Sequence, residues 1–254
     1  MKRGHRSGWR WLIVCGLALN VAWVQADEVR VAVAANFQAP MQKIAEAFAQ
    51  DTTHTAQLIV GSTGKFYLQI TQGAPFHVLL SADDETPVRL EREGFAVSGT
   101  RFTYATGRLA LWSVKPQAVD DKGEVLRSAR GDKLAIADPK LAPYGAAAMQ
   151  VLTRLGVLSQ WQSQLVQGEN IAQTYQFVLT ENASLGFVAL SQVWRDGRLT
   201  RGSMWLVPQS LHDPLRQDAV LLQAGNHQPA ARALLNYLRG ERAQAIIRAY
   251  GYAL

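Results

Sequence analysis

Residues 28–48, EVRVAVAANFQAPMQKIAEAF, determine the fold class of this chain. Three valines alternate with other residues in the first seven positions, which predicts a strand with one apolar face. From Met41 to Phe48 the apolar side chains follow the i, i+3, i+4, i+7 spacing of an amphipathic helix. Pro40 stands early in this helix, where proline is tolerated. A strand followed at once by a helix is the unit from which parallel sheets are built.

The rest of the chain repeats this alternation of short strands and helices. Strands are predicted at residues 57–60, 77–80, 108–114, 133–137, 185–189, 204–207 and 219–223. Helices are predicted at residues 65–71, 84–93, 146–155 and 171–180, and in two closing segments around Leu235 and Ile247. The sequence contains no internal repeat and no linker rich in Pro, Gly or Ser. We therefore expect an α/β fold whose lobes are joined by short crossovers.

The charge of the chain is unevenly distributed. Its 254 residues include 26 Lys and Arg against 20 Asp and Glu, a formal surplus of +6. Four of the positive charges lie in the first ten residues, before an apolar run at 11–24 that leads to Ala26. This order is typical of a secretory signal peptide, here with cleavage after Ala26. The competing interpretation is an uncleaved anchor, but the run is short and is interrupted by Gly16 and Asn20.

Removal of residues 1–26 leaves 228 residues with 22 basic and 20 acidic side chains, a surplus of only two. Binding to nucleic acid requires a dense basic stripe, so the composition speaks against such a partner. The single cysteine, Cys15, lies within the predicted signal peptide. A disulfide framework and a thiolate zinc site are therefore excluded.

Patterns typical of enzymes are absent from the sequence. The four histidines after residue 26 have no metal-binding spacing, and there is no GxSxG nucleophile elbow. Gly61–Lys65 (GSTGK) resembles a P-loop, but Ile59 replaces the first glycine and Phe66 replaces the magnesium-binding hydroxyl. The acidic residues 83–85 are interpreted as the start of a helix. We expect a protein that is not an enzyme, and an exported hydrolase with an unrecognised site is the alternative.

Four junctions between a strand and the next helix have a common chemical character. They lie at residues 35–37, 61–64, 138–145 and 168–171, and they offer small or hydroxyl side chains beside free N–H groups. Such helix N-termini bind anions without a cationic side chain. In open parallel sheets these junctions meet at the carboxyl ends of the strands. Each alone is also explained by helix capping, so their joint occurrence carries the prediction.

The chain resembles the periplasmic molybdate-binding proteins that serve ABC importers. The matching stretches include VAVAANFQAPMQKIAEAF, GSTGKFYLQITQGAPFHVLLSADDETPVRL, LAIADPKLAPYGAAAMQVLTRLG, GENIAQTYQFVLTENASLGFVALSQV and NYLRGERAQAIIRAYGY. The resemblance implies a type II periplasmic binding protein, with two lobes that are each a mainly parallel sheet flanked by helices. Two crossover strands would join lobe 1, residues 27–106 plus 206–254, to lobe 2, residues 107–205.

The resemblance also implies a ligand shell. The residues that match the family's ligand positions are Asn36, Ser62, Thr63, Tyr144 and Ile171. Asn36 would donate from its backbone and side chain, Tyr144 from its backbone or hydroxyl, and Ile171 from its backbone, with Thr63 better aligned than Ser62. Other members place a tyrosine where this chain has Ala189, so we expect the tyrosine of the PYG segment to replace it.

Molybdate and tungstate are dianions without protons, so a shell made only of hydrogen-bond donors suits them. We expect Asp138 and Glu169 to face away from the pocket and Lys65 to be solvated rather than to bind the ligand. Sulfate would be rejected by its smaller size, whereas molybdate and tungstate cannot be ranked. We expect no cofactor and no directly coordinated metal, a monomer, and a membrane permease as partner. The alternative within this class is a binder of sulfate, thiosulfate or another oxyanion.

Overall fold

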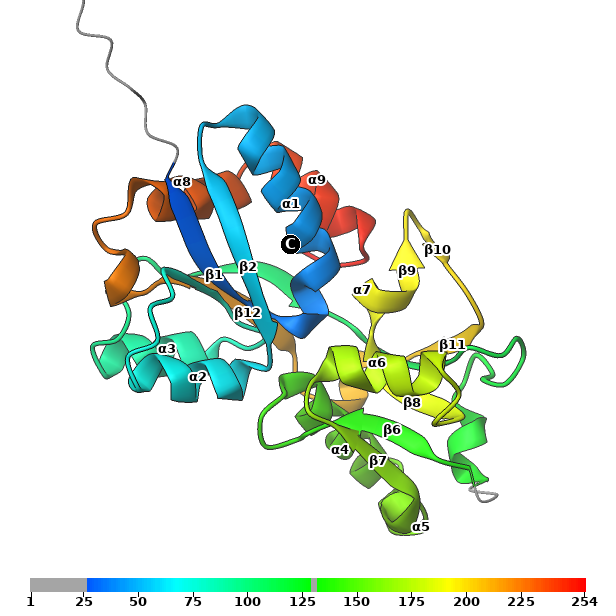
Figure 1. Ribbon diagram of the computed structural model, residues 1–254. Coiled ribbons are helices and arrows are strands. Elements are labelled where there is room, and N and C mark those ends of the chain that lie inside the picture. Colours follow the sequence, from blue (N-terminus) through cyan, green and yellow to red (C-terminus); the bar gives the residue numbers. More distant parts are fainter. Residues whose placement is uncertain (1–26, 129–131) are drawn as a thin grey trace, which may run out of the picture.

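The computed structural model describes residues 27–128 and 132–254 (Figure 1). The predicted signal peptide and its cleavage after Ala26 lie outside these residues. Within the described part of the chain, no helix is long and apolar enough to cross a membrane. The described residues form two lobes, each built on a five-stranded sheet with helices on both faces.

The first sheet has the strand order β2-β1-β3-β12-β4. Its strands are β1 (Glu28–Ala34), β2 (Thr55–Gly61), β3 (Val78–Leu80), β4 (Phe102–Gly107) and β12 (Leu215–Leu221). β1 pairs in parallel with β2 and β3, whereas β12 runs antiparallel to β3 and β4. The alternation along β1 gives each face of the sheet its own core.

One face of this sheet carries the three valines of β1. They pack with side chains of α1 (Gln38–Asp51), α8 (Pro229–Leu238) and α9 (Glu241–Ala249). Ala32 lies on the other face, in a core that also contains side chains of α2 (Thr63–Thr71) and α3 (Glu85–Arg92). Figure 1 shows α1, α8 and α9 on one side of the sheet and α2 and α3 on the other.

The second sheet has the strand order β11-β5-β8-β6-β7. Its strands are β5 (Leu109–Ser113), β6 (Leu134–Ala137), β7 (Leu165–Gly168), β8 (Leu185–Ala189) and β11 (Ser203–Leu206). α4 (Pro143–Arg154) and α5 (Leu158–Trp161) cover one face, and α6 (Ile171–Leu179) covers the other. After β8, α7 (Leu190–Val193) leads into a hairpin of β9 (Trp194–Arg195) and β10 (Arg198–Leu199), in which Arg195 stacks 3.7 Å from the Tyr250 ring of the first lobe.

Each sheet contains two parallel and two antiparallel pairings. The expectation of mainly parallel sheets thus holds for β2-β1-β3 and for β8-β6-β7, and the remaining strands form an antiparallel part. These strands carry the chain between the lobes: it leaves the first sheet by β4, enters the second by β5, and returns by β11 and β12. In each sheet, the strand by which the chain leaves and the neighbouring strand by which it enters run in opposite directions, β4 against β12 and β5 against β11. The limits of the two lobes as moving bodies, residues 107 and 206, stay a prediction.

The parallel strands place the four strand-to-helix junctions. β1 and β2 end at the paired residues Ala34 and Gly61, and β6 and β7 end at the paired residues Ala137 and Gly168. Two junctions therefore project from the carboxyl edge of each sheet.

Candidate functional site

A small cavity lies where the junctions of the two lobes meet. Its empty volume, which includes space open to solvent, is about 210 Å³. The residues that line it are Ala34, Ala35, Asn36, Gly61, Ser62, Thr63, Ala82, Ala142, Pro143, Tyr144, Asn170 and Ile171. All five predicted site residues are in this set, so the structure brings them together although they lie on both lobes. Their role as ligands remains a prediction.

Ser62 and Thr63 begin helix α2. Ser62 is at the N-cap position, yet its hydroxyl makes no capping hydrogen bond. Its Oγ is buried and has no partner among the described residues. Thr63 Oγ1 accepts the backbone N–H of Ala82 at 3.0 Å and a longer bond from Ser81 Oγ at 3.4 Å, which leaves its own proton for another acceptor. Capping therefore does not explain either hydroxyl, and both can donate into the cavity.

The N-terminus of helix α6 has a single free donor. The side-chain oxygen of Asn170 accepts from the N–H groups of Ala172 and Gln173 at 3.0 and 3.1 Å. The N–H of Thr174 bonds to the carbonyl of Asn170 at 3.1 Å. Of the first helical N–H groups, only that of Ile171 lacks a partner among the described residues, and Ile171 lines the cavity.

Tyr144 lies in the first turn of helix α4, directly after Pro143. Proline has no backbone N–H and is therefore well tolerated at the start of a helix. The Tyr144 side chain is buried and its hydroxyl accepts a hydrogen bond from Gln217 Nε2 at 3.1 Å. Burial raises the pKa of Tyr144 well above 10, so the hydroxyl keeps its proton at neutral pH. A Cβ at Gly107 would overlap this hydroxyl, so only glycine lets the end of β4 come so close.

The side chain of Asn36, which was expected to donate to the ligand, donates to two other residues of the protein instead. Its Nδ2 group donates to Gln217 Oε1 at 2.8 Å and to the Tyr252 hydroxyl at 3.0 Å, which uses both of its hydrogens. Its carbonyl accepts from Ser191 Oγ at 2.7 Å and from Tyr252 at 2.8 Å. The backbone N–H of Asn36 is the donor that remains for a ligand, because the side chain is engaged inside the protein.

Sequence reasoning did not identify the buried polar residues behind the cavity, Gln217, Tyr252, Tyr104 and Ser191. Burial raises the pKa of Tyr104 well above 10 and that of Tyr252 to about 12, so both hydroxyls stay protonated. Tyr252 lies in one of the matching stretches, but nothing in its neighbours distinguishes it from a core tyrosine. Gln217 stands between Arg216 and Asp218 on β12, so its neighbours in the sequence do not mark it either.

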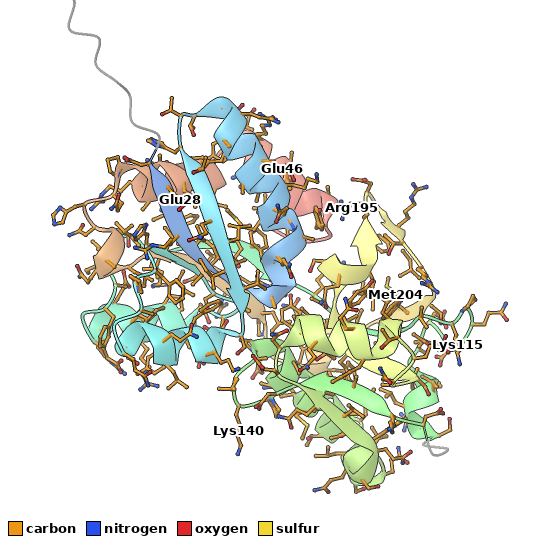
Figure 2. The ribbon with its side chains drawn as sticks, viewed as in Figure 1. Glu28, Glu46, Lys115, Lys140, Arg195 and Met204 are labelled. Carbon is orange, nitrogen blue, oxygen red and sulfur yellow. The ribbon has the colours of Figure 1, made fainter. Side chains whose placement is uncertain are left out.

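None of the described residues that line the cavity has an acidic or basic side chain. Lys65 forms an ion pair with Glu169 across the two lobes, so it is engaged rather than only solvated. Glu169 and Asp138 do not line the cavity, and Asp138 accepts the N–H of Lys140 at 2.9 Å. Lys140 itself points outward from its loop (Figure 2). The described lining of the cavity therefore offers neutral donors and no carboxylate that would repel an anion.

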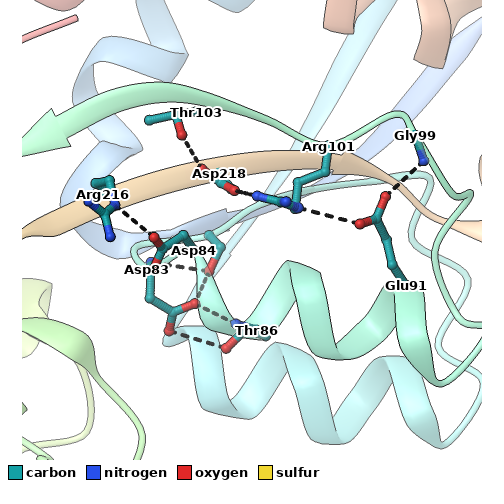
Figure 3. A network of polar contacts seen from close by, with 10 residues as sticks. Asp83, Asp84, Thr86, Glu91, Gly99, Arg101, Thr103, Arg216 and Asp218 are labelled. Atoms are coloured by element: carbon teal, nitrogen blue, oxygen red, sulfur yellow. Dashed lines mark hydrogen bonds and ion pairs between the residues drawn. The ribbon is translucent and has the colours of Figure 1, made fainter.

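Two of the acidic residues 83–85, Asp83 and Asp84, belong to a structural network outside the cavity (Figure 3). Asp83 accepts from the backbone N–H and hydroxyl of Thr86 at 2.9 and 3.1 Å, which fits the predicted role at a helix start. Burial raises the pKa of Asp83. Asp84 pairs with Arg216 at 2.8 Å, and nearby the fully buried Asp218 pairs with Arg101 at 2.5 Å. Among the described residues, no group of three His, Cys, Asp or Glu side chains is placed to hold a metal ion.

Comparison with known proteins places the chain in a family. The model of the bacterial extracellular solute-binding proteins matches residues 29–253. This chain belongs to that family. The solute-binding protein is 56% identical over 245 residues to the molybdate-binding protein ModA of Azotobacter vinelandii, with 96% of this chain and 97% of that protein covered. It is 51% identical to ModA of Rhodobacter capsulatus, over 94% of this chain and 92% of that protein.

A solved structure resembles the solute-binding protein over most of its length. The periplasmic molybdate-binding protein of Azotobacter vinelandii superposes with a TM-score of 0.86 at 39% identity, covering 89% of this chain and 99% of that one. The two-lobed binding-protein fold expected from the sequence is thereby confirmed. Membership of an extracellular solute-binding family also places the folded protein outside the cytoplasm.

Proposed function

We propose that this protein captures molybdate, or tungstate, in the cavity between its lobes and delivers it to a membrane ABC permease. The observation that carries the proposal is the composition of the cavity wall: unpaired donors from both lobes, and no acidic side chain among its described residues. A fully deprotonated tetrahedral dianion is the ligand that such a wall accommodates. The ModA relatives, 56% and 51% identical over nearly their full length, support the same ligand.

The donors proposed for the anion come from both lobes. Lobe 1 contributes the hydroxyls of Ser62 and Thr63 and the N–H of Asn36; lobe 2 contributes the hydroxyl of Tyr144 and the N–H of Ile171. Hydrogen bonds to a charged group contribute about 1.5–3 kcal/mol each. Micromolar affinity requires about 8 kcal/mol, so five donors suffice after the ordering costs of binding. Because the donors lie on two lobes, the ligand would also hold the lobes together.

The remaining parts of the proposal follow from this role. We infer a monomer that catalyses no reaction, because capture and release require only the opening of the lobes. We also infer that residues 1–26 direct export and are removed after Ala26. Mass spectrometry of the exported protein tests the cleavage site, and light scattering with and without ligand tests the monomer.

Isothermal titration calorimetry of the protein lacking residues 1–26 tests the ligand. We expect saturable one-to-one binding of molybdate and tungstate and much weaker binding of sulfate and hydrogen phosphate. Binding should raise the melting temperature with ligand concentration, because only the folded protein binds. Saturation by sulfate or phosphate alone would overturn the proposal in favour of another oxyanion.

A further inference from the structure

The Tyr144 hydroxyl receives a hydrogen bond from inside the protein, and this bond limits where its own proton can go. Gln217, fully buried on β12, donates from Nε2 to the Tyr144 oxygen at 3.1 Å. A hydroxyl that accepts such a bond turns its proton away from the donor. The acceptor indicated for this proton among the described residues is the neutral hydroxyl of Tyr252, which adds to burial in raising the pKa of Tyr144. Because Tyr144 also lines the cavity, and an anion is a stronger acceptor than a neutral hydroxyl, a bound anion can take this proton.

The orientation of the Gln217 amide is set by its neighbours. Asn36 Nδ2 donates to Gln217 Oε1 at 2.8 Å. The Tyr104 hydroxyl lies 3.0 Å from the same oxygen and 2.9 Å from the carbonyl of Ser81, and it shares its proton between these two acceptors. Since the Oε1 atom of Gln217 faces these donors, its NH₂ group must face Tyr144.

A backbone carbonyl determines which group is the donor in each bond of this chain of hydrogen bonds. The carbonyl oxygen of Asn36 can only accept, and the Tyr252 hydroxyl lies 2.8 Å from it as donor. Tyr252 must then accept from Asn36 Nδ2, which lies 3.0 Å away. The amide of Asn36 is thereby oriented, and it orients Gln217 in turn. Every bond from the Asn36 carbonyl to Tyr144 has one direction.

We propose that Gln217 is a specificity-determining positioning residue: it makes Tyr144 present a proton to the bound anion and so selects oxyanions that carry no proton of their own. The inference rests on the proposed function, because it concerns the same cavity. A side chain at position 217 that can only accept hydrogen bonds would reverse the direction of its bond with the Tyr144 hydroxyl. In Gln217→Glu the carboxylate takes the proton of Tyr144, and the Tyr144 oxygen then offers a lone pair to the cavity. That oxygen can accept the proton of hydrogen phosphate and repels molybdate.

Sulfate and hydrogen phosphate form a matched pair of probes for this proposal. At pH 8 both are tetrahedral dianions of nearly the same size, but only hydrogen phosphate has a proton to donate. Competition against molybdate gives their dissociation constants for the wild type, Gln217→Glu, Tyr144→Phe and the double variant. We expect Gln217→Glu to weaken molybdate and sulfate by about tenfold or more and to raise the phosphate-to-sulfate affinity ratio by a similar factor. In the Tyr144→Phe background the ratio should not change.

The ratio distinguishes the proposal from simpler effects of the substitution. Charge repulsion or a disturbed fold would weaken both dianions equally, and an unchanged ratio would overturn the role of Gln217. If Gln217→Glu does not fold, the neutral Gln217→Met replaces it: its loss of molybdate affinity should largely disappear in the Tyr144→Phe background, and additive losses would overturn the proposal. Failure of the proposed function looks different, since the wild type itself would then not bind molybdate.

Discussion

The backbone N–H of Gly64 in the first lobe donates to the carbonyl oxygen of Leu141 in the second lobe at 2.9 Å. A Cβ at position 64 would lie 2.9 Å from the Leu141 Cα and 3.1 Å from its carbonyl oxygen. The two lobes can therefore make this contact only because Gly64 has no side chain. The contact joins the first turn of α2 to the loop before α4, next to Thr63 and Ala142, which line the cavity.

Gly64→Ala should impair closure while leaving the unliganded protein intact. Alanine is favoured over glycine in helices by about 1 kcal/mol, so the unliganded melting temperature should stay equal or rise. Molybdate affinity should fall by about tenfold or more, because the closed form that binds the ligand contains the clash. Calorimetry measures the affinity, and small-angle scattering with excess molybdate should show a larger radius of gyration than the wild type. Wild-type affinity would show that closure tolerates a methyl group at this position.

The ion pair between Lys65 and Glu169 should slow the release of the ligand. Both side chains are partly exposed, so the pair contributes at most about 1 kcal/mol. We expect Lys65→Gln to raise the dissociation rate of molybdate by up to about fivefold at low salt and hardly at all at 0.5 M salt. Stopped-flow competition measures this rate. Lys43→Gln is the matched control, because its partner Glu46 lies on the same helix of one lobe; an equal effect of both variants would contradict the prediction.

Ser62→Ala and Thr63→Ala should separate binding from stability. Ser62 Oγ has no partner in the part of the chain that the structure describes, so its removal should leave the unliganded melting temperature unchanged or slightly higher. Removing the Thr63 hydroxyl leaves the buried N–H of Ala82 without its acceptor, at a cost of about 1–3 kcal/mol in the free energy of unfolding. Both variants should weaken molybdate binding by about tenfold. Denaturant unfolding and calorimetry test this contrast, and a destabilised Ser62→Ala would mean that its hydroxyl has a structural role.

The pH dependence of stability should depend in part on Asp83. Burial raises the pKa of Asp83, so protonation favours the folded state. The contribution of this group to the free energy of unfolding is fully present below the unfolded-state pKa, near 4, and is lost as pH rises through the folded-state pKa. Asp83→Asn removes this loss, so its melting temperature should exceed that of the wild type at pH 7.5 and approach it at pH 4. A difference that grows at acid pH would contradict the assignment.

Elements with strong local patterns were predicted closely from the sequence. The strand at Glu28–Ala34 was placed at its observed limits because its valines alternate with other residues, and the strand at Leu185–Ala189 because it is a continuous short apolar run. Helix α4 begins at Pro143, three residues before its prediction, since the loop DPKLAPYG conceals the helix start. The short strands β4 and β7 were missed because neither has a run of apolar residues.

The candidate site was predicted in part, and the missing part has a physical reason. The strand-to-helix junctions are local features, so the lining residues could be identified from short motifs. The support behind them is not local: Gln217 bonds to Tyr144 and Asn36, which lie 73 and 181 positions away in the chain. A glutamine between an exposed arginine and a buried aspartate has no pattern that indicates these partners. For the same reason the sequence assigned the Asn36 side chain to the ligand, whereas it belongs to this buried network.

The hydrogen bond between Tyr252 and the Asn36 carbonyl joins a residue that is synthesised early to one that is synthesised late. The two residues are 216 positions apart, and the ribosome synthesises Asn36 early and Tyr252 late. The lining residues from Ala34 to Ile171 are all present on a growing chain long before the tyrosine that orients their network has been added. A chain that stops before residue 252 can hold every predicted ligand residue and still lack the polarity that directs Tyr144. If the network sets the direction of the Tyr144 proton as proposed, discrimination between anions would require synthesis to have reached Tyr252.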